Sequence, residues 1–182
     1  SSLPVSLVQA KAELVVEHDE HDVQIRDAIE DAVDFIRREA QIRLAPTVLE
    51  QQLERWPCGG PARIELETGP VRDVTSISYV DVDNQVQDLD AADWRWSRTS
   101  AGAVITFGDA WSRPALACRP DAIRIVFAAG FNNPEASDGD PELNLPPSAR
   151  RAVLMLTRVI YSKADQFPQA VHDAVDKVRV YR

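Results

Sequence analysis

The stretch Val74-Thr75-Ser76-Ile77-Ser78-Tyr79-Val80-Asp81 decides the fold class of the middle of the chain. Its side chains divide between two faces: Thr75, Ile77 and Tyr79 on one, and Val74, Ser76, Ser78 and Val80 on the other. A period of two is what a β-sheet imposes, so this stretch is predicted to be a strand. The dipeptide Asp83-Asn84 predicts a hairpin turn directly after it.

Other β-rich pieces, separated by Gly and Pro, lie on both sides of this strand. We expect them at residues 48–56, 63–66, 94–97, 104–107 and 123–129. Residues 130–147 are rich in turn-forming residues and poor in apolar ones, which predicts a long loop facing solvent or a partner.

Helical periodicity frames the β-rich middle. Ser6 followed by Gln9 predicts a capping box and a short helix over 7–15. A second N-cap is predicted at Asp19, opening a long amphipathic helix that ends near Pro46. Its apolar positions step by three and four: Ile25, Ile29, Ala32, Val33, Ile36 and Ala40. A third helix is predicted over 148–163, with Ala152, Val153, Leu156, Val159 and Ile160 on one stripe.

These elements predict an α+β chain in which a helical bundle carries a β-rich insertion. The expected parts are an N-terminal helix pair (1–46), the insertion (47–147, including the loop 130–147), a C-terminal helix that completes the helical core (148–164) and a tail (165–182). The tail has apolar residues at helical spacing but is too short to be a stable helix alone. It either packs on its own domain or leaves as an arm that orders on a neighbouring protein.

The composition fits one globular domain with a real core. The chain has 182 residues, of which 45% are hydrophobic and 27% charged, and a net charge of -9. No apolar run approaches the roughly 18 residues of a membrane span, so we expect a soluble protein made in the cytoplasm. No stripe of Lys and Arg suited to phosphate binding stands out. Cys58 and Cys118 belong to no metal or redox motif and are expected to be reduced.

Candidate chemistry is confined to one acidic cluster, Glu17-His18-Asp19-Glu20-His21-Asp22. Two histidines three residues apart beside carboxylates could ligate a metal, and a metal-dependent hydrolase using His18, Asp19, His21 and Asp22 is one alternative. Capping of the helix explains the acidic residues more simply, because its N-terminus favours negative charge. The motifs of nucleophilic, nucleotide-dependent and zincin-type enzymes are lacking, so we expect no catalysis, metal or cofactor.

All four tryptophans, Trp56, Trp94, Trp96 and Trp111, fall in the β-rich middle. They are expected in the core or at a subunit interface.

The order of features resembles the head-to-tail connector (adaptor) proteins of tailed phages, a family also found in gene transfer agents. The resemblance rests on these residues: Leu7-Val8-Gln9-Ala10-Lys11, His18-Asp19-Glu20-His21-Asp22, Ile25, Ile29, Trp56-Pro57, the run from Gly69 to Ile77, Tyr79-Val80-Asp81, Phe127-Ala128-Ala129-Gly130-Phe131, Leu145-Pro146-Pro147, Ala152 and Leu156.

The resemblance implies a structural virion protein at the head–tail junction, made in the cytoplasm of the host bacterium. Its subunits would form a dodecameric ring attached to the portal protein, with a tail-side connector or stopper protein below it. DNA would pass through the ring without sequence-specific binding, since an acidic lumen repels phosphates. The C-terminal segment would dock on the portal, and the candidate docking residues are Phe167, Val171, Val175, Val178, Arg179, Tyr181 and Arg182. Besides the hydrolase, a non-viral β-rich protein-interaction module is the other alternative.

Overall fold

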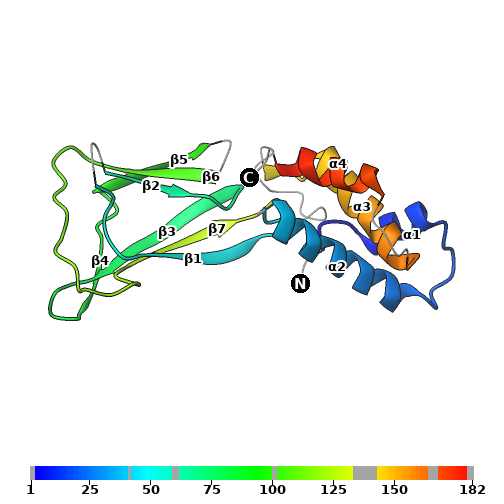
Figure 1. Ribbon diagram of the computed structural model, residues 1–182, viewed down its shortest axis with the longest axis horizontal. Coiled ribbons are helices and arrows are strands. Elements are labelled where there is room, and N and C mark those ends of the chain that lie inside the picture. The colour runs from blue at the N-terminus through cyan, green and yellow to red at the C-terminus, as the bar shows by residue number, and fades with distance from the viewer. Residues whose placement is uncertain are drawn as a thin grey trace. The chain divides into compact units, whose positions relative to one another are not determined.

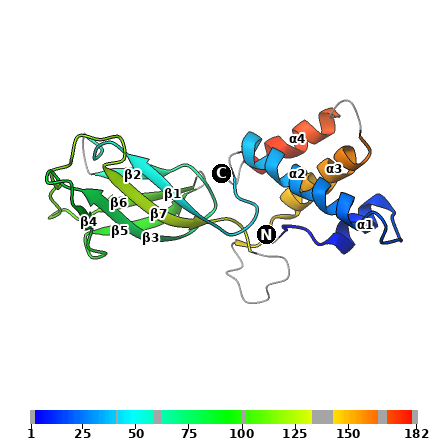
Figure 2. The same cartoon turned by 90° about the horizontal axis from the view of Figure 1, so that it is seen from below.

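The computed structural model describes residues 3–40, 42–58, 62–99, 102–132, 143–163 and 168–179. The chain divides into two compact units, a helical unit formed by Ser1–Pro46 with Gly130–Arg182 and a sandwich unit formed by Thr47–Ala129. Figures 1 and 2 show helices confined to the first unit and strands to the second. The predicted α+β class is therefore confirmed.

The helical unit contains four helices within the described residues: α1 (Leu7–Leu14), α2 (Asp22–Ala40), α3 (Pro147–Tyr161) and α4 (Gln169–Val178). The predicted capping box is present at the start of α1. The Gln9 N–H donates to the Ser6 hydroxyl and the Ser6 N–H donates to the Gln9 side chain, each over 3.2 Å. None of the described helices is long and apolar enough to cross a membrane.

The predicted N-cap at Asp19 is wrong. Helix α2 begins at Asp22, and its first intrahelical bond runs from the Ile25 N–H to the His21 carbonyl over 2.9 Å. The Asp19 carboxylate instead accepts a hydrogen bond from the Lys11 ammonium of α1, which also donates to Asp22. The fold brings the Lys11 ammonium close to Asp19, so the Asp19 carboxylate forms an ion pair with it and does not cap the helix.

The core of the helical unit forms where the apolar stripes of the four helices meet. Its most deeply buried members include Ile25, Ile29, Ile36, Ala152, Leu156, Val171 and Val178. Phe131 and Leu145 bury their side chains in the same core. The β-rich insertion therefore ends at Ala129 and not at residue 147 as expected, because the apolar ends of the segment 130–147 belong to the helical core.

The sandwich unit has seven strands in its described part: β1 (Thr47–Leu53), β2 (Arg63–Leu66), β3 (Val71–Val80), β4 (Val86–Asp88), β5 (Trp94–Thr99), β6 (Gly102–Phe107) and β7 (Ile123–Ala129). They form an antiparallel sheet of order β1-β7-β3-β4 and another of order β2-β6-β5. One hydrophobic cluster draws on both sheets, with Ile64 and Ile105 from one and Ile77, Ile125 and Phe127 from the other. The two sheets therefore pack face to face.

The prediction that side chains of β3 alternate strictly between two faces of the sheet is wrong at one position. Val74 and Ile77 were expected on opposite faces, yet both are buried in the sandwich core. The pairing of β3 with β7 shifts register between Val74 and Ser76, which is the signature of a β-bulge. An extra residue in one strand turns the following side chains to the other face, so both apolar residues reach the core.

Candidate assembly surfaces

The docking valines predicted in the tail are buried within the chain itself. Val171, Val175 and Val178 lie on α4 and are at most 3% exposed in the core of the helical unit. The structure thus has α4 packed on its own domain, the first of the two alternatives for the tail. Phe167, Tyr181 and Arg182 lie outside the described residues.

Arg179, the remaining docking candidate, lies at the end of α4 and is exposed. Its Nε donates to the Glu39 carbonyl over 3.1 Å, and its Nη1 lies 3.0 Å from an Asp176 carboxylate oxygen. The carboxylates of Glu39 and Asp176 are about half exposed or more, so their ion pairs with Arg179 stabilise the fold only slightly. An acidic group of a partner could replace them.

The His18–Asp22 cluster is engaged in contacts between helices. The His21 imidazole shares a hydrogen bond with the Tyr161 hydroxyl of α3. The His18 ring packs edge-on against the His21 ring, with 4.7 Å between the ring centroids. Lys11 holds the Asp19 carboxylate, which lowers the pKa of Asp19 and raises that of Lys11. Within the described ranges, no group of three or more His, Cys, Asp or Glu side chains is placed to hold a metal ion.

The tryptophans of the sandwich unit serve mainly as core. Trp56 is 5% exposed and its indole N–H donates to the Pro114 carbonyl over 3.1 Å. Phe107 and Trp111 stack at 4.1 Å, and Trp56 meets both rings edge-on. This cluster closes one region of the sandwich core.

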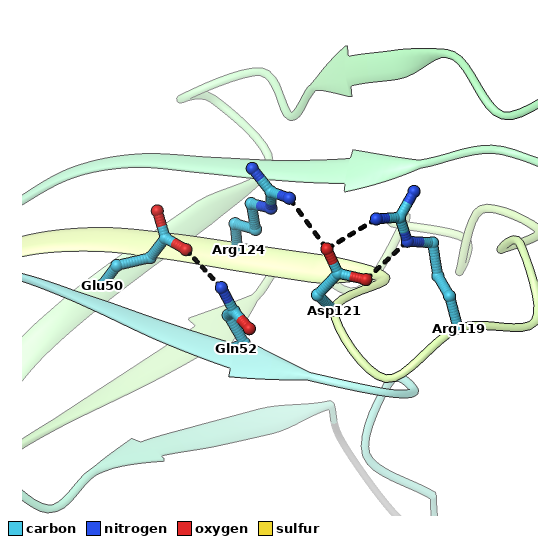
Figure 3. Close-up of polar contacts among 5 residues, drawn as sticks. All are labelled: Glu50, Gln52, Arg119, Asp121 and Arg124. Carbon is cyan, nitrogen blue, oxygen red and sulfur yellow. Dashed lines mark hydrogen bonds and ion pairs between the residues drawn. The ribbon is translucent and has the colours of Figure 1, made fainter.

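A compact ion network precedes β7 (Figure 3). The Arg119 guanidinium donates two hydrogen bonds to the Asp121 carboxylate, and Arg124 donates a third over 2.8 Å. Arg119 first, and then Arg124, hold the pKa of Asp121 well below its usual range. On the neighbouring β1, Gln52 donates to Glu50 over 2.6 Å. The network ties the residues just before β7 to the start of that strand, within the sandwich unit.

The hairpin between β3 and β4 presents a rigid, partly apolar tip. The Asp81 carboxylate accepts hydrogen bonds from the Gln85 N–H over 2.9 Å, the Gln87 side-chain amide over 2.8 Å and the Asp83 N–H over 3.0 Å, and these bonds lower the pKa of Asp81. Val82 and Val86 beside the turn are 63% and 68% exposed. The hairpin turn predicted at Asp83-Asn84 is confirmed.

Two faces of the helical unit carry opposite charge, and the sequence analysis missed both. Helix α2 exposes Asp27, Glu30, Asp31 and Asp34 on one face, and α3 exposes Arg151 and Arg158. The signal lay in the spacing, because residues three, four and seven apart share one face of a helix. A search for a contiguous run of basic residues overlooks such a face.

No protein-family model and no curated protein matches the sequence. Solved structures do share the fold. A chain of the neck of an empty gene transfer agent particle, computed with C6 symmetry, is 18% identical, with a TM-score of 0.71 over 100% of this chain and 94% of that one. A chain of the virion of a native particle is 20% identical, with a TM-score of 0.72 and coverage of 98% and 89%.

The neck of the native particle, computed with C12 symmetry, gives 20% identity and a TM-score of 0.70, with coverage of 100% and 90%. The alignments extend through both units, so the likeness belongs to the combination of helical unit and sandwich and not to a sandwich alone. The chain therefore has the fold of chains found in the neck and virion of gene transfer agent particles, as its resemblance to head-to-tail connectors implied.

Proposed function

We propose that this chain is a structural subunit of the neck of a phage-like particle, at the junction of head and tail. The observation that carries the proposal is the match in fold over the full length of the chain to chains of such necks. The match spans both the helical unit and the sandwich inserted into it, which makes it more informative about role than a match to one unit alone. Fold alone hosts many functions, however, so the role needs its own test.

The subunit acts by forming a ring around the DNA channel, as a head-to-tail adaptor. The necks that share its fold were computed with C6 and C12 symmetry, which supports a homo-oligomeric ring, with twelve copies as the simplest count. The net charge of -9 suits a channel that DNA crosses without binding. The portal protein lies on the head side of this ring and a connector or stopper protein on the tail side.

The role is structural and not catalytic. The polar clusters that could carry chemistry are engaged in fixing the fold: His21 with Tyr161, Asp19 with Lys11, and Asp121 with its two arginines. Each cluster ties together elements of its own unit, which supports a building block over a hydrolase.

The experiment that tests the role mixes the purified chain with portal rings of the same particle and images the complexes by electron microscopy. We expect a ring of this protein stacked coaxially on the portal. Failure to associate at any salt concentration between 50 and 500 mM, roughly the range over which charge screening changes most, would contradict the proposal.

We further propose that the end of the chain docks this ring on the portal. Val171, Val175 and Val178 are buried in the helical core, so the docking contacts are assigned to Arg179 and to the residues after it, including Tyr181 and Arg182. A chain ending after Arg179 keeps α4 and should form rings that no longer join the portal. A chain ending after Lys163 exposes the core and should be less stable, so the shorter truncation is the informative one.

A further inference from the structure

We propose that neighbouring subunits of the ring join through their helical units, with the basic face of α3 on one copy packed against the acidic face of α2 on the next. The basic face comprises Arg150, Arg151, Leu154, Met155 and Arg158, and the acidic face comprises Asp27, Glu30, Asp31 and Asp34. This inference rests on the proposed function, because it names the contact that builds the ring.

The basic face combines charge with an apolar floor. Arg151 and Arg158 are exposed, and the half-buried Leu154 and Met155 lie between them at positions three and four residues on from Arg151. Grooves flank this face, one of about 600 Å³ along α3 and one of about 470 Å³ between α3 and α4. Such a ridge between two grooves is a shape into which a second helix fits.

The arginines of this face have no acidic partner within the described residues. No ion pair joins Arg150, Arg151 or Arg158 to a described carboxylate, and the Arg150 Nε is buried without a hydrogen-bond acceptor among them. The exposed guanidinium groups of Arg151 and Arg158 are open to carboxylates arriving on a partner, which would form charge-assisted hydrogen bonds with them.

The acidic face is the complement. Asp27, Glu30 and Asp31 are exposed and form no ion pair with another described residue, whereas Asp34 lies 3.1 Å from Arg37 of its own helix. Val23, one turn before Asp27, is 70% exposed and adds an apolar contact at the end of the face. The face thus offers carboxylates together with one apolar side chain.

The spacings of the two faces agree. Asp27 and Asp34 are seven residues apart, as are Arg151 and Arg158, and seven residues span about 10.5 Å of helix. Two helices lying side by side can therefore align two ion pairs at once. Leu154 and Met155 lie between the pairs, where closure of the interface removes them from water.

A second copy fits this face better than nucleic acid does. Leu154 and Met155 between the arginines have no partner in a phosphate backbone, whereas a second helix would bury them. Within the helical unit, α2 runs along one side while α3 and α4 run along the other (Figure 1). Two different patches on opposite sides of one unit make a heterologous contact, which closes into a ring when the rotation between neighbouring copies is a whole fraction of a turn.

The test uses charge reversal on the full-length chain. The basic-face variant carries Arg151→Glu with Arg158→Glu, and the acidic-face variant carries Asp27→Arg with Asp31→Arg. All four side chains are exposed, so both variants should keep the wild-type circular dichroism spectrum. Each variant alone should give at least about tenfold fewer rings, counted by electron microscopy on portal templates, because like charges then face each other.

An equimolar mixture of the two variants should restore the rings. In the mixture, the reversed α3 of one variant meets the reversed α2 of the other, and the two unchanged faces also meet. A tag on one variant should therefore recover both in a 1:1 ratio. The control carries Arg95→Glu with Arg113→Glu, which makes the same change of charge on exposed arginines of the sandwich unit and should assemble normally.

The outcomes separate the interface from the role. Normal assembly by both variants would overturn the interface while leaving the neck role intact. Folded variants that stay unassembled when mixed would overturn the pairing of these two faces. A wild-type chain that forms no ring, even on portal templates, would overturn the proposed function and the interface with it.

Discussion

At the scale of single residues, Gly130, like Gly102, has no room for a side chain. Its φ is +120°, and a Cβ there would lie 2.1 Å from the Ala45 carbonyl oxygen. We expect Gly130→Ala to lower the free energy of unfolding by about 2 kcal/mol or more, measured by urea denaturation. Gly108→Ala is the matched control, since its Cβ would meet only the Asp93 carbonyl oxygen at 3.9 Å. Equal midpoints for the two variants would show that the clash is relieved elsewhere.

Asp121 should make stability depend on pH in acid. Its folded pKa lies well below the unfolded value because Arg119 and Arg124 stabilise the carboxylate. The stabilisation is therefore complete above the unfolded pKa of about 4 and is lost as the pH falls from there towards the folded pKa. The Tm of Asp121→Asn should be lower than that of the wild type at pH 7 and should fall less between pH 4 and pH 2.

The comparison for Asp121 is Asp109→Asn, which removes an exposed carboxylate of the same unit. Its melting temperature should follow the wild-type curve over the whole pH range. If Asp121→Asn also followed that curve, the ion network would contribute nothing to the stability of the sandwich.

At the scale of elements, α4 decides whether the tail is part of the domain or an arm. Val175 is 3% exposed within the helical core, so Val175→Ala should cost about 2 kcal/mol in transfer and cavity terms. Lys177→Ala on the exposed side of α4 should change stability by no more than about 0.5 kcal/mol. Hydrogen exchange of α4 amides reports the effect directly. Protection that is equally low in wild type and Val175→Ala would mean that α4 spends its time off the core.

Local signals were enough to find most elements. The strands β2 and β7 lie where Gly and Pro punctuation and apolar content predicted them, and α1 follows the Ser6 cap as expected. Strand β4 was not predicted, because Val86–Asp88 is exposed throughout and exists only by pairing with β3. The bulge in β3 was not predicted either, because it arises from the pairing of β3 with β7 and leaves no mark in the sequence of one strand.

The assembly surfaces were harder to predict than the elements. Apolar spacing in the tail is the same for a helix that packs on its own domain and for one that packs on a partner, so Val171 and Val175 could not be assigned from the sequence. The exposure of Arg151 and Arg158 depends on which face of α3 the other helices cover. Only the three-dimensional packing of the helical unit supplies that information.

At the scale of the whole molecule, the two units should fold independently. The sandwich begins at Thr47 and ends at Ala129, and these residues are partners in the antiparallel pairing of β1 with β7. Their Cα atoms are thus about 5 Å apart. A fragment of residues 47–129 should therefore unfold cooperatively, and the helical unit should fold when a linker of about four Gly and Ser residues joins Pro46 to Gly130.

Circular dichroism and the dispersion of amide signals in NMR spectra measure whether each fragment is folded. Each should keep the secondary structure that it has in the full chain, because each unit has its own hydrophobic core. A molten sandwich fragment would show that its core needs the helical unit.

The pairing of Thr47 with Ala129 also fixes how the molecule carries a mechanical load. The chain leaves the helical unit and returns to it through neighbouring residues, and Ile42, Leu44 and Phe131 anchor both crossings in the helical core. Tension applied between the helices on either side of the insertion is therefore borne by the packing of the helical core, to which those three side chains belong, and bypasses the sandwich. The sandwich is a side loop outside the line of force, so it can be enlarged or exchanged without weakening the helical unit, through which the proposed ring contacts are made.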